Sequence, residues 1–382
     1  MNKQKICIIG DGLAGLSTAI ILSQENLEID LYGGINKKNT TRKDNRTIAI
    51  SESNYQFIKN KIKPKGANIF WPCKEINLFF EDTKKMQNFL QYKKKEKNLM
   101  YIFKNKELKK KINAKILVKK NIKLIKKNIN DIDYNNGSIL INKNFFYYDL
   151  IILCVGNHTK LYNKITQGRS IEKNYKEISL TTIVQHSSKI GSVSQFFLKE
   201  GPLAILPFNK FFFSIVWSVS NLFFYENKKS LKKILRKKIT SLIRNLKIKK
   251  IDDIQSYPIK LNLQTRYYKK NILILGDGLH SVHPMAGQGF NLILRDIKKL
   301  SELISDALKI GLSLKTSFVL NDFYKARKPE NTILGLGINI TNIFFKDNKY
   351  FSPIRKKILS NINNFNFIKK ISQRISDKGI SS

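Results

Sequence analysis

Two glycine-rich segments carry the residues of this chain that could do chemistry. The first, residues 10–15 (GDGLAG), follows an apolar run at 6–9 and leads into a helix-like pattern at 13–24. Glycine at its first, third and sixth positions permits a tight turn, close approach of a pyrophosphate, and close packing of the helix on the strand. The spacing therefore predicts the strand, turn and helix of a dinucleotide-binding unit.

The second segment, residues 276–291 (GDGLHSVHPMAGQGFN), follows an apolar run at 272–275 and leads into a helix-like pattern at 290–310. Its glycines let the backbone approach a flat ring closely, and the start of the helix offers unpaired N–H groups to an electron-rich ligand. Asp277 stands at a strand end, where its carboxylate can accept hydrogen bonds from sugar hydroxyls. Either segment alone is weak evidence, but together they indicate a nucleotide cofactor.

In this order and at this separation, the two segments resemble those of the flavin-dependent aromatic-ring hydroxylases. Within that group the chain is similar to the ubiquinone-biosynthesis hydroxylase family. Residues 44–51 (DNRTIAIS) match the family's segment after its first β-α-β unit, and residues 201–207 with 214–217 match its paired mid-chain strands. Residues similar to those in its C-terminal helices are Tyr324, Arg327, Pro353 and Arg355. The match is dense around 271–296 and thin between 82 and 148.

The resemblance implies an α/β fold in which a Rossmann-like FAD-binding domain is interleaved with a mostly antiparallel β-sheet substrate domain, followed by C-terminal helices. The expected FAD-binding domain comprises residues 1–75, 102–172 and 268–330. The expected substrate domain comprises 76–101 and 173–267, and the helical tail 331–382. Periodicity agrees with a mixed layout, with strand-like runs at 6–9, 151–155, 212–217 and 272–275. The apolar stretch 211–225 is interpreted as two adjoining strands.

The resemblance also implies the residues of the site. Those expected to contact FAD are Gly10, Gly12, Ala14, Gly15, Arg46, Asp277, Pro284, Gly287, Gln288, Gly289 and Asn291. Those expected to act beside the flavin ring are Arg46, His283 and Pro284. The residues themselves leave two alternatives open. Arg46 could form a surface ion pair with Asp44 or Glu52, and a histidine before proline could serve as a structural cap.

Two positions depart from the family pattern. Gly33 stands where a carboxylate usually binds the adenosine ribose, after the strand-like run 29–32. Val155, before Gly156, stands where the family has an acidic residue associated with flavin and reduced nicotinamide. We therefore expect reduction by free NADPH or NADH to be slow or to need a partner.

Composition sets wider bounds. The 382 residues can bury a large core, and 70 Lys+Arg against 28 Asp+Glu give a formal net charge of +42. This charge could attract an anionic surface or could reflect biased composition, because the lysines are spread throughout the chain without a basic module typical of nucleic-acid binding.

The three cysteines, Cys7, Cys73 and Cys154, show no metal-ligand spacing, so no metal is expected. No apolar run reaches the roughly 18 residues of a spanning helix, and the early first strand leaves no room for a signal peptide, so we expect a cytoplasmic protein.

The leading functional hypothesis is an FAD monooxygenase that hydroxylates a polyprenylated phenol in ubiquinone synthesis, using O2 and electrons from NAD(P)H or a reductase partner. The alternatives are a flavin-dependent reductase or dehydrogenase acting on an isoprenoid or aromatic substrate, and a non-catalytic FAD-binding accessory protein. Association with a ubiquinone-biosynthesis complex is a further possibility.

A membrane-resident substrate would require docking at the cytoplasmic face of the inner membrane. Residues 331–345 carry no charge and are rich in Ile, Leu and Phe. The cations that follow are Lys346, Lys349, Arg355, Lys356 and Lys357. An apolar helix face beside cations is typical of interfacial binding. The alternative is a helix that packs its apolar side on the protein, which Gly335 and Gly337 would permit.

Overall fold

The computed structural model describes residues 3–33, 44–64, 68–82, 85–127, 129, 131–156, 159–188, 190–346 and 366–380. Its first layer is a six-stranded sheet built on buried apolar strands. In spatial order its strands are β19 (Tyr268–Lys269), β20 (Ile272–Ile274), β12 (Leu150–Leu153), β1 (Gln4–Ile9), β2 (Leu27–Tyr32) and β8 (Ile122–Ile125). All neighbours are parallel except β19 and β20. Continuous apolar strands such as β12 suit this parallel sheet, because both of its faces are buried.

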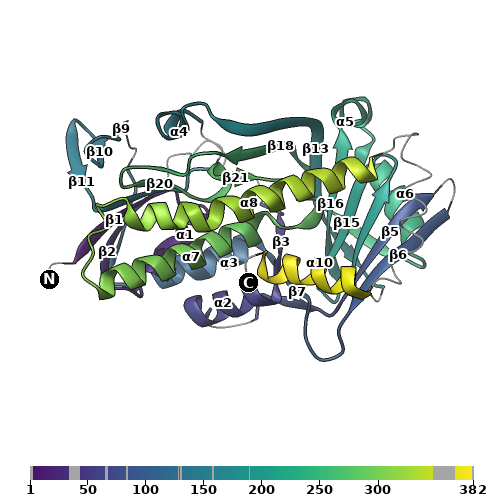
Figure 1. Cartoon of the computed structure of the whole chain (residues 1–382). Helices are drawn as coiled ribbons and strands as arrows, with labels where there is room; N and C mark the ends of the chain where they lie inside the picture. Colours follow the sequence, from purple (N-terminus) through teal and green to yellow (C-terminus); the bar gives the residue numbers. More distant parts are fainter. Residues whose placement is uncertain are drawn as a thin grey trace.

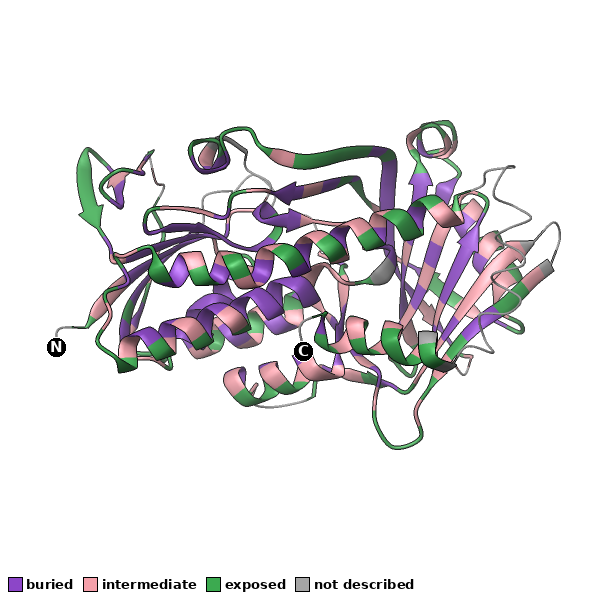
Figure 2. Ribbon diagram, viewed as in Figure 1, coloured by how far each residue is buried: buried purple, intermediate pink, exposed green. Residues whose placement is uncertain are grey.

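Helices α1 (Leu13–Leu22), α3 (Asn105–Ile116) and α7 (Gly289–Lys309) lie beside this sheet in Figure 1, and α8 (Phe318–Phe345) packs against α7 and runs on into the other half of the molecule. Helix α7 is buried all round over residues 291–297, including Leu294 and Ile297, and exposed positions appear only further along the helix (Figure 2). Within the described ranges the other α-helices are α2 (Glu52–Ile62), α4 (Thr159–Thr166), α5 (Asn221–Asn227), α6 (Leu231–Leu242) and α10 (Asn366–Lys378).

The second layer is a nine-stranded sheet in the other half of the molecule (Figure 1). In order its strands are β21 (His280–Ser281), β18 (Gln255–Gln264), β13 (Ser170–His186), β16 (Phe212–Ser220), β15 (Gly201–Asn209), β14 (Val193–Leu198), β5 (Glu75–Asp82) and β6 (Lys85–Lys93), with β17 (Ile248–Ile251) beside β13. Only β14 and β5 pair in parallel, so this sheet is mostly antiparallel, as predicted. Its buried side packs around the fully buried Trp217 and Phe213.

Two small antiparallel sheets complete the fold. One joins β3 (Thr47–Ser51), β7 (Met100–Lys104) and β4 (Trp71–Cys73), and the other joins β9 (Asp131–Asp133), β10 (Ser138–Ile141) and β11 (Asn144–Tyr147). The strand-like runs predicted from periodicity correspond to β1, β12, β16 and β20. The interpretation of 211–225 as two strands was wrong, because β16 ends at Ser220 and α5 begins at the next residue. The Ser220 hydroxyl accepts a hydrogen bond from the Phe223 N–H at 3.1 Å and so starts a helix.

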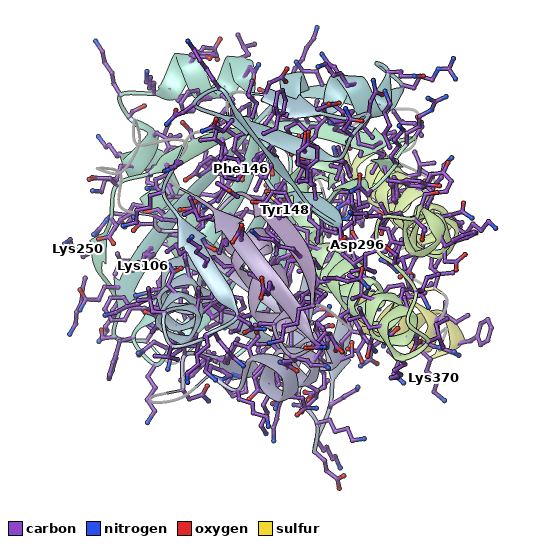
Figure 3. The ribbon with its side chains drawn as sticks, turned by 90° about the vertical axis from the view of Figure 1, so that its left-hand side faces the viewer. Lys106, Phe146, Tyr148, Lys250, Asp296 and Lys370 are labelled. Atoms are coloured by element: carbon purple, nitrogen blue, oxygen red, sulfur yellow. The ribbon has the colours of Figure 1, made fainter. Side chains whose placement is uncertain are left out.

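The positive charge is spread over the surface. In Figure 3 the exposed Lys106 and Lys250 project from one side and Lys370 from the other. Within the described ranges no helix is long and apolar enough to cross a membrane. The domain boundaries remain a prediction, although α8 runs without interruption through residue 331, where the tail was expected to begin.

Candidate functional site

A cavity of about 870 Å³ lies where the two large sheets meet, within the size range of ligand sites. Much of its wall comes from the turn after β1, strand β3, the segment 282–291, one face of the nine-stranded sheet, and helix α10. Of the eleven expected cofactor contacts, all except Gly15 line this cavity. The cavity therefore brings together two glycine segments that are far apart in the sequence.

The turn after β1 depends on glycine at two positions. Gly10 has φ +117°, and a Cβ there would lie 2.4 Å from the Cys154 carbonyl oxygen. A Cβ at Gly15 would lie 1.9 Å from the Gly10 carbonyl oxygen, so Gly15 lets α1 pack against the turn from behind. Gly12, at the N-cap of α1, faces open space, and no side chain caps this helix. The N–H groups at the start of α1 are therefore available to an anionic ligand.

Asp277 lies on the opposite glycine segment and faces the same cavity. Its side chain is exposed to the cavity, yet it is surrounded by protein, because the cavity is deep. Burial raises the pKa of the Asp277 carboxyl group, and attraction to His280 and Arg46 opposes the rise only in part. A carboxylate held in this way would gain from accepting hydrogen bonds from a ligand.

The segment 284–291 forms a turn and then starts α7. Pro284, Gly287 (φ +59°), Gln288 and Gly289 line the cavity, and no side chain caps α7. Asn291 also lines it, but its amide is fully used within the protein. The side-chain oxygen accepts hydrogen bonds from the Ser51 N–H (2.9 Å) and the Asn54 side chain (2.8 Å). The side-chain nitrogen donates to the carbonyls of Ala49 (3.0 Å) and Gly287 (3.1 Å). These four hydrogen bonds brace β3, α2 and the turn at Gly287 around the cavity, and the expected contact of Asn291 with the flavin stays a prediction.

Arg46 combines both roles that its sequence left open. It lines the cavity, and its guanidinium donates to both carboxylate oxygens of Asp44, at 2.9 and 3.0 Å. It also lies over the Tyr257 ring, 5.7 Å from the ring centroid. The bond to Asp44 raises the pKa of Arg46, so its positive charge is fixed at the cavity wall. The wall can therefore present a cation that is already oriented by Asp44.

His283 is not among the described residues of the cavity wall, and its expected catalytic role stays a prediction. Its ring is fully buried, with Nε2 2.9 Å from a Glu177 carboxylate oxygen. Its Nδ1 accepts the Met285 N–H at 3.1 Å. The acceptor role of Nδ1 places the ring proton on Nε2, facing Glu177. Burial alone would raise the pKa of Glu177, but hydrogen bonds from His283 and Lys346 hold it below its ordinary value. The bond to the Met285 N–H is the contact expected of a structural cap, one of the two roles that the sequence left open.

A row of side chains across the nine-stranded sheet forms the opposite wall. Strand register places Thr181 beside Val216, then Ala204, Gln195 and Leu78, and all five line the cavity. Thr181 is 4% exposed and Gln195 7%, and the Thr181 hydroxyl has no hydrogen-bond partner within the described part of the chain. Apolar side chains around the row are Ile76, Leu99, Met100, Val193, Phe197 and Leu206. This wall suits an apolar ligand with a few polar substituents. The sequence predicted a mostly antiparallel sheet here but did not identify this row of side chains.

Helix α10 closes a further side of the cavity with Gln373, Ser376 and Asp377. The Asp377 carboxylate accepts the Ser53 N–H at 2.9 Å at the start of α2. Arg295 donates to the Ser376 carbonyl at 2.8 Å. These contacts join α10 to α2 and α7. Sequence inspection missed α10 as part of the site, and no local motif marks it.

The structure also locates the two positions that depart from the family pattern and the remaining histidines that it describes. Val155 lines the cavity, and Gly33 lies against Asp11. His280 is buried, with Nε2 2.5 Å from Oδ2 of Asp296. His158 lies outside the described residues. In the part of the chain that the structure describes, no group of three or more His, Cys, Asp or Glu side chains is arranged to hold a metal ion.

Comparison with known proteins gives two kinds of similarity. A family model described as squalene epoxidase matches residues 222–370. The mitochondrial ubiquinone biosynthesis monooxygenase COQ6 of Dictyostelium discoideum is 26% identical, over 46% of this chain and 42% of that protein. Ubiquinone hydroxylase UbiL of Rhodospirillum rubrum is 27% identical, over 42% of this chain and 38% of that protein. The chain thus spans about two fifths of the length of these relatives.

Among solved structures, HpxO of Klebsiella pneumoniae, complexed with FAD and uric acid, has a TM-score of 0.75 and 14% identity, over 98% of this chain and 97% of that one. These findings confirm the predicted resemblance to ubiquinone-biosynthesis hydroxylases and the α/β fold with its two large sheets and C-terminal helices.

Proposed function

We propose that this chain is an FAD-dependent monooxygenase that hydroxylates the aromatic ring of a polyprenylated phenol in ubiquinone biosynthesis. The observation that carries the proposal is one cavity in which a dinucleotide-type turn, a second glycine segment and an apolar sheet face meet. Similarity to COQ6 and UbiL supports the ubiquinone pathway. The apolar lining supports a lipid-like substrate.

The residues fit FAD. Open space beyond Gly12 and Gly289 leaves room for a ligand close to the backbone. The turn at Gly10 and the start of α1 would bind the pyrophosphate, and Asp277 would accept hydrogen bonds from sugar hydroxyls. N–H groups at the start of α7 would face the electron-rich edge of the flavin. When bound, FAD would supply the oxygen-dependent redox chemistry, while the sheet face orients the phenol and excludes water.

The test begins with the absorption spectrum of the purified chain, then oxygen consumption with phenol substrates and analysis of products from a lipid extract. We expect non-covalently bound flavin and a product that carries one added oxygen. A protein that neither contains flavin nor takes it up on titration would contradict the proposal. Bound flavin without an oxygenated product would favour the reductase or accessory alternatives.

For the electron donor, we infer that free NADPH or NADH reduces the flavin slowly, or that a partner protein delivers the electrons. Val155 places an apolar side chain on the cavity wall where the family has an acid. Stopped-flow bleaching of the flavin by each nicotinamide measures the rate. Bleaching at ordinary catalytic rates, about 1 s⁻¹ or faster, would overturn this inference.

We further infer peripheral, salt-sensitive attachment to an anionic membrane. Along α8, Ile333, Ile340 and Ile343 are 55%, 64% and 44% exposed. The opposite side of α8 packs on the sheet, since a Cβ at Gly335 would lie 2.7 Å from Leu263. Lys346, expected to face the membrane, instead pairs with Glu177 at 2.5 Å. Lys349, Arg355, Lys356 and Lys357 lie outside the described residues.

Co-sedimentation with anionic liposomes at low and high salt tests this attachment. The double variant Ile333→Gln/Ile340→Gln should bind less than wild type, because apolar area in the interface is lost. The control is Leu117→Gln, which changes a side chain that is 74% exposed on another helix end. No binding of the wild type at low salt would refute the inference.

A further inference from the structure

Position 33 lacks the carboxylate that usually binds the adenosine ribose in this type of fold. Strand β2 ends at Tyr32, and the next residue is Gly33, which has no side chain to bind a ribose. In dinucleotide-binding units a carboxylate at this strand end accepts hydrogen bonds from the ribose hydroxyls. Either this chain holds the ribose without a carboxylate, or another residue supplies one.

Asp11 occupies the space that a side chain at position 33 would need. A Cβ built on Gly33 would lie 2.6 Å from Cβ, 3.0 Å from Cγ and 3.1 Å from Oδ2 of Asp11. The backbone around both residues is fixed by the sheet. The Gly33 N–H donates to the Ile125 carbonyl at 3.1 Å, and the Gly10 N–H donates to the Tyr32 carbonyl at 2.8 Å. The contact therefore follows from the sheet geometry.

The Asp11 carboxylate also faces the ligand space. Asp11, Gly12 and Gly33 are all part of the cavity wall, and Asp11 is half-buried. Within the described residues its carboxylate has neither a hydrogen bond nor an ion pair. A half-buried carboxylate on a ligand cavity, with no partner among the described residues, is well placed to accept a hydrogen bond from a donor on the ligand.

We propose that Asp11 replaces the missing acid and that its carboxylate accepts hydrogen bonds from the vicinal hydroxyls of the adenosine ribose. The acid has moved from the end of β2 to the second position of the glycine turn, and glycine at position 33 is the steric consequence. This inference rests on the proposed function only in taking FAD as the dinucleotide.

The test measures the Kd of the cofactor-free chain for FAD by fluorescence titration. Asp11→Gly should raise the Kd about ten-fold, because charge-assisted hydrogen bonds to the ribose are lost. The Kd for FMN, which lacks the adenosine, should not change. Asp11→Asn keeps the shape of the side chain and should also weaken FAD binding while the Tm stays the same. Asp253→Gly removes a fully exposed loop carboxylate and is the matched charge control.

A swap separates a ribose contact from a general effect on the turn. Asp11→Gly makes room for a side chain at position 33, so the double variant Asp11→Gly/Gly33→Glu should regain FAD affinity. Gly33→Glu alone should bind FAD poorly, because the new side chain meets Asp11. An unchanged Kd in Asp11→Gly, or no recovery in the double variant, would overturn the assignment of Asp11. Failure of the wild type to bind FAD would instead refute the proposed function.

Discussion

One wall of the cavity is formed mainly by backbone groups, and the opposite wall is formed mainly by side chains. The nucleotide wall is mostly backbone, with glycines at Gly10, Gly12 and Gly287 and uncapped helix starts at α1 and α7. The sheet wall is made of side chains, in the row from Thr181 to Gln195. The turn after β1 has no room for added atoms at Gly10 and Gly15, whereas a side-chain wall can change its polarity while the fold persists. Substitutions in the two walls should therefore differ in kind as well as in size.

The largest effect is expected at Gly15. Gly15→Ala would place a Cβ 1.9 Å from the Gly10 carbonyl oxygen, so the turn and α1 must separate. We expect a loss of about 3 kcal/mol or more in the free energy of unfolding, together with loss of FAD binding. Thermal unfolding and flavin content measure the two effects. Gly191→Ala, where a Cβ meets open space, is the control and should change neither.

Asp277 should have the next largest effect, on ligand binding. Asp277→Ala should weaken FAD binding by about 1–3 kcal/mol, because the sugar hydroxyls lose a deeply placed acceptor. Titration of the cofactor-free protein with FAD measures the change. Equal FAD affinity in this variant and the wild type would show that Asp277 accepts no hydrogen bond from the cofactor.

Asp277 should have the opposite effect on the stability of the cofactor-free chain. Burial raises the pKa of Asp277 above its unfolded value, so the folded state holds the proton more tightly. Stability from this group is fully present below the unfolded pKa and is lost as the pH rises through the folded pKa. Asp277→Asn should therefore be more stable than wild type at neutral pH, and the difference should vanish in acid. Urea unfolding between about pH 4 and about pH 8 tests this.

The sheet wall should give a smaller effect, confined to the substrate. Thr181→Val and Gln195→Leu should each raise the KM for the phenol about ten-fold, because each removes roughly one hydrogen bond to the substrate. FAD binding should stay unchanged. Thr181→Val should also discriminate less between the phenol and its methyl ether. Ser218→Ala, a buried residue off the cavity wall, is the control. Loss of flavin in either variant would show that the sheet wall also takes part in binding the cofactor.

The smallest effect on chemistry is expected at His283. Because its two ring nitrogens are engaged by Glu177 and the Met285 N–H, His283→Gln should lower the Tm but leave the pH dependence of kcat as it is in wild type. A pH–rate profile of the folded variant measures this. A profile that loses one ionisation would return His283 to the catalytic residues.

The difference between the walls also explains what could be predicted from the sequence. Gly10, Gly12 and Asp277 were found because a local spacing fixes a turn, and the turn fixes the ligand position. Thr181 and Gln195 were not found, because they become neighbours of one ligand only through the register of four strands. Three strand spacings, about 14 Å, separate them across the sheet. The bracing of Asn291 and His283 by distant partners was likewise invisible to local patterns. Asp11 could have been noticed as an acid next to a position that lacks one.

Helix α10 adds a consequence for the order in which the chain matures. The cavity wall includes Asp11 near one end of the sequence and Asp377 near the other. During synthesis the nucleotide turn emerges early, but the enclosure stays incomplete until α10 has left the ribosome and docked on Ser53 and Arg295. Between the emergence of the segment 282–291 and that of α10, the nascent chain thus presents an open, partly apolar basin. Loading of the cofactor and shielding by chaperones would therefore compete for the same unfinished surface.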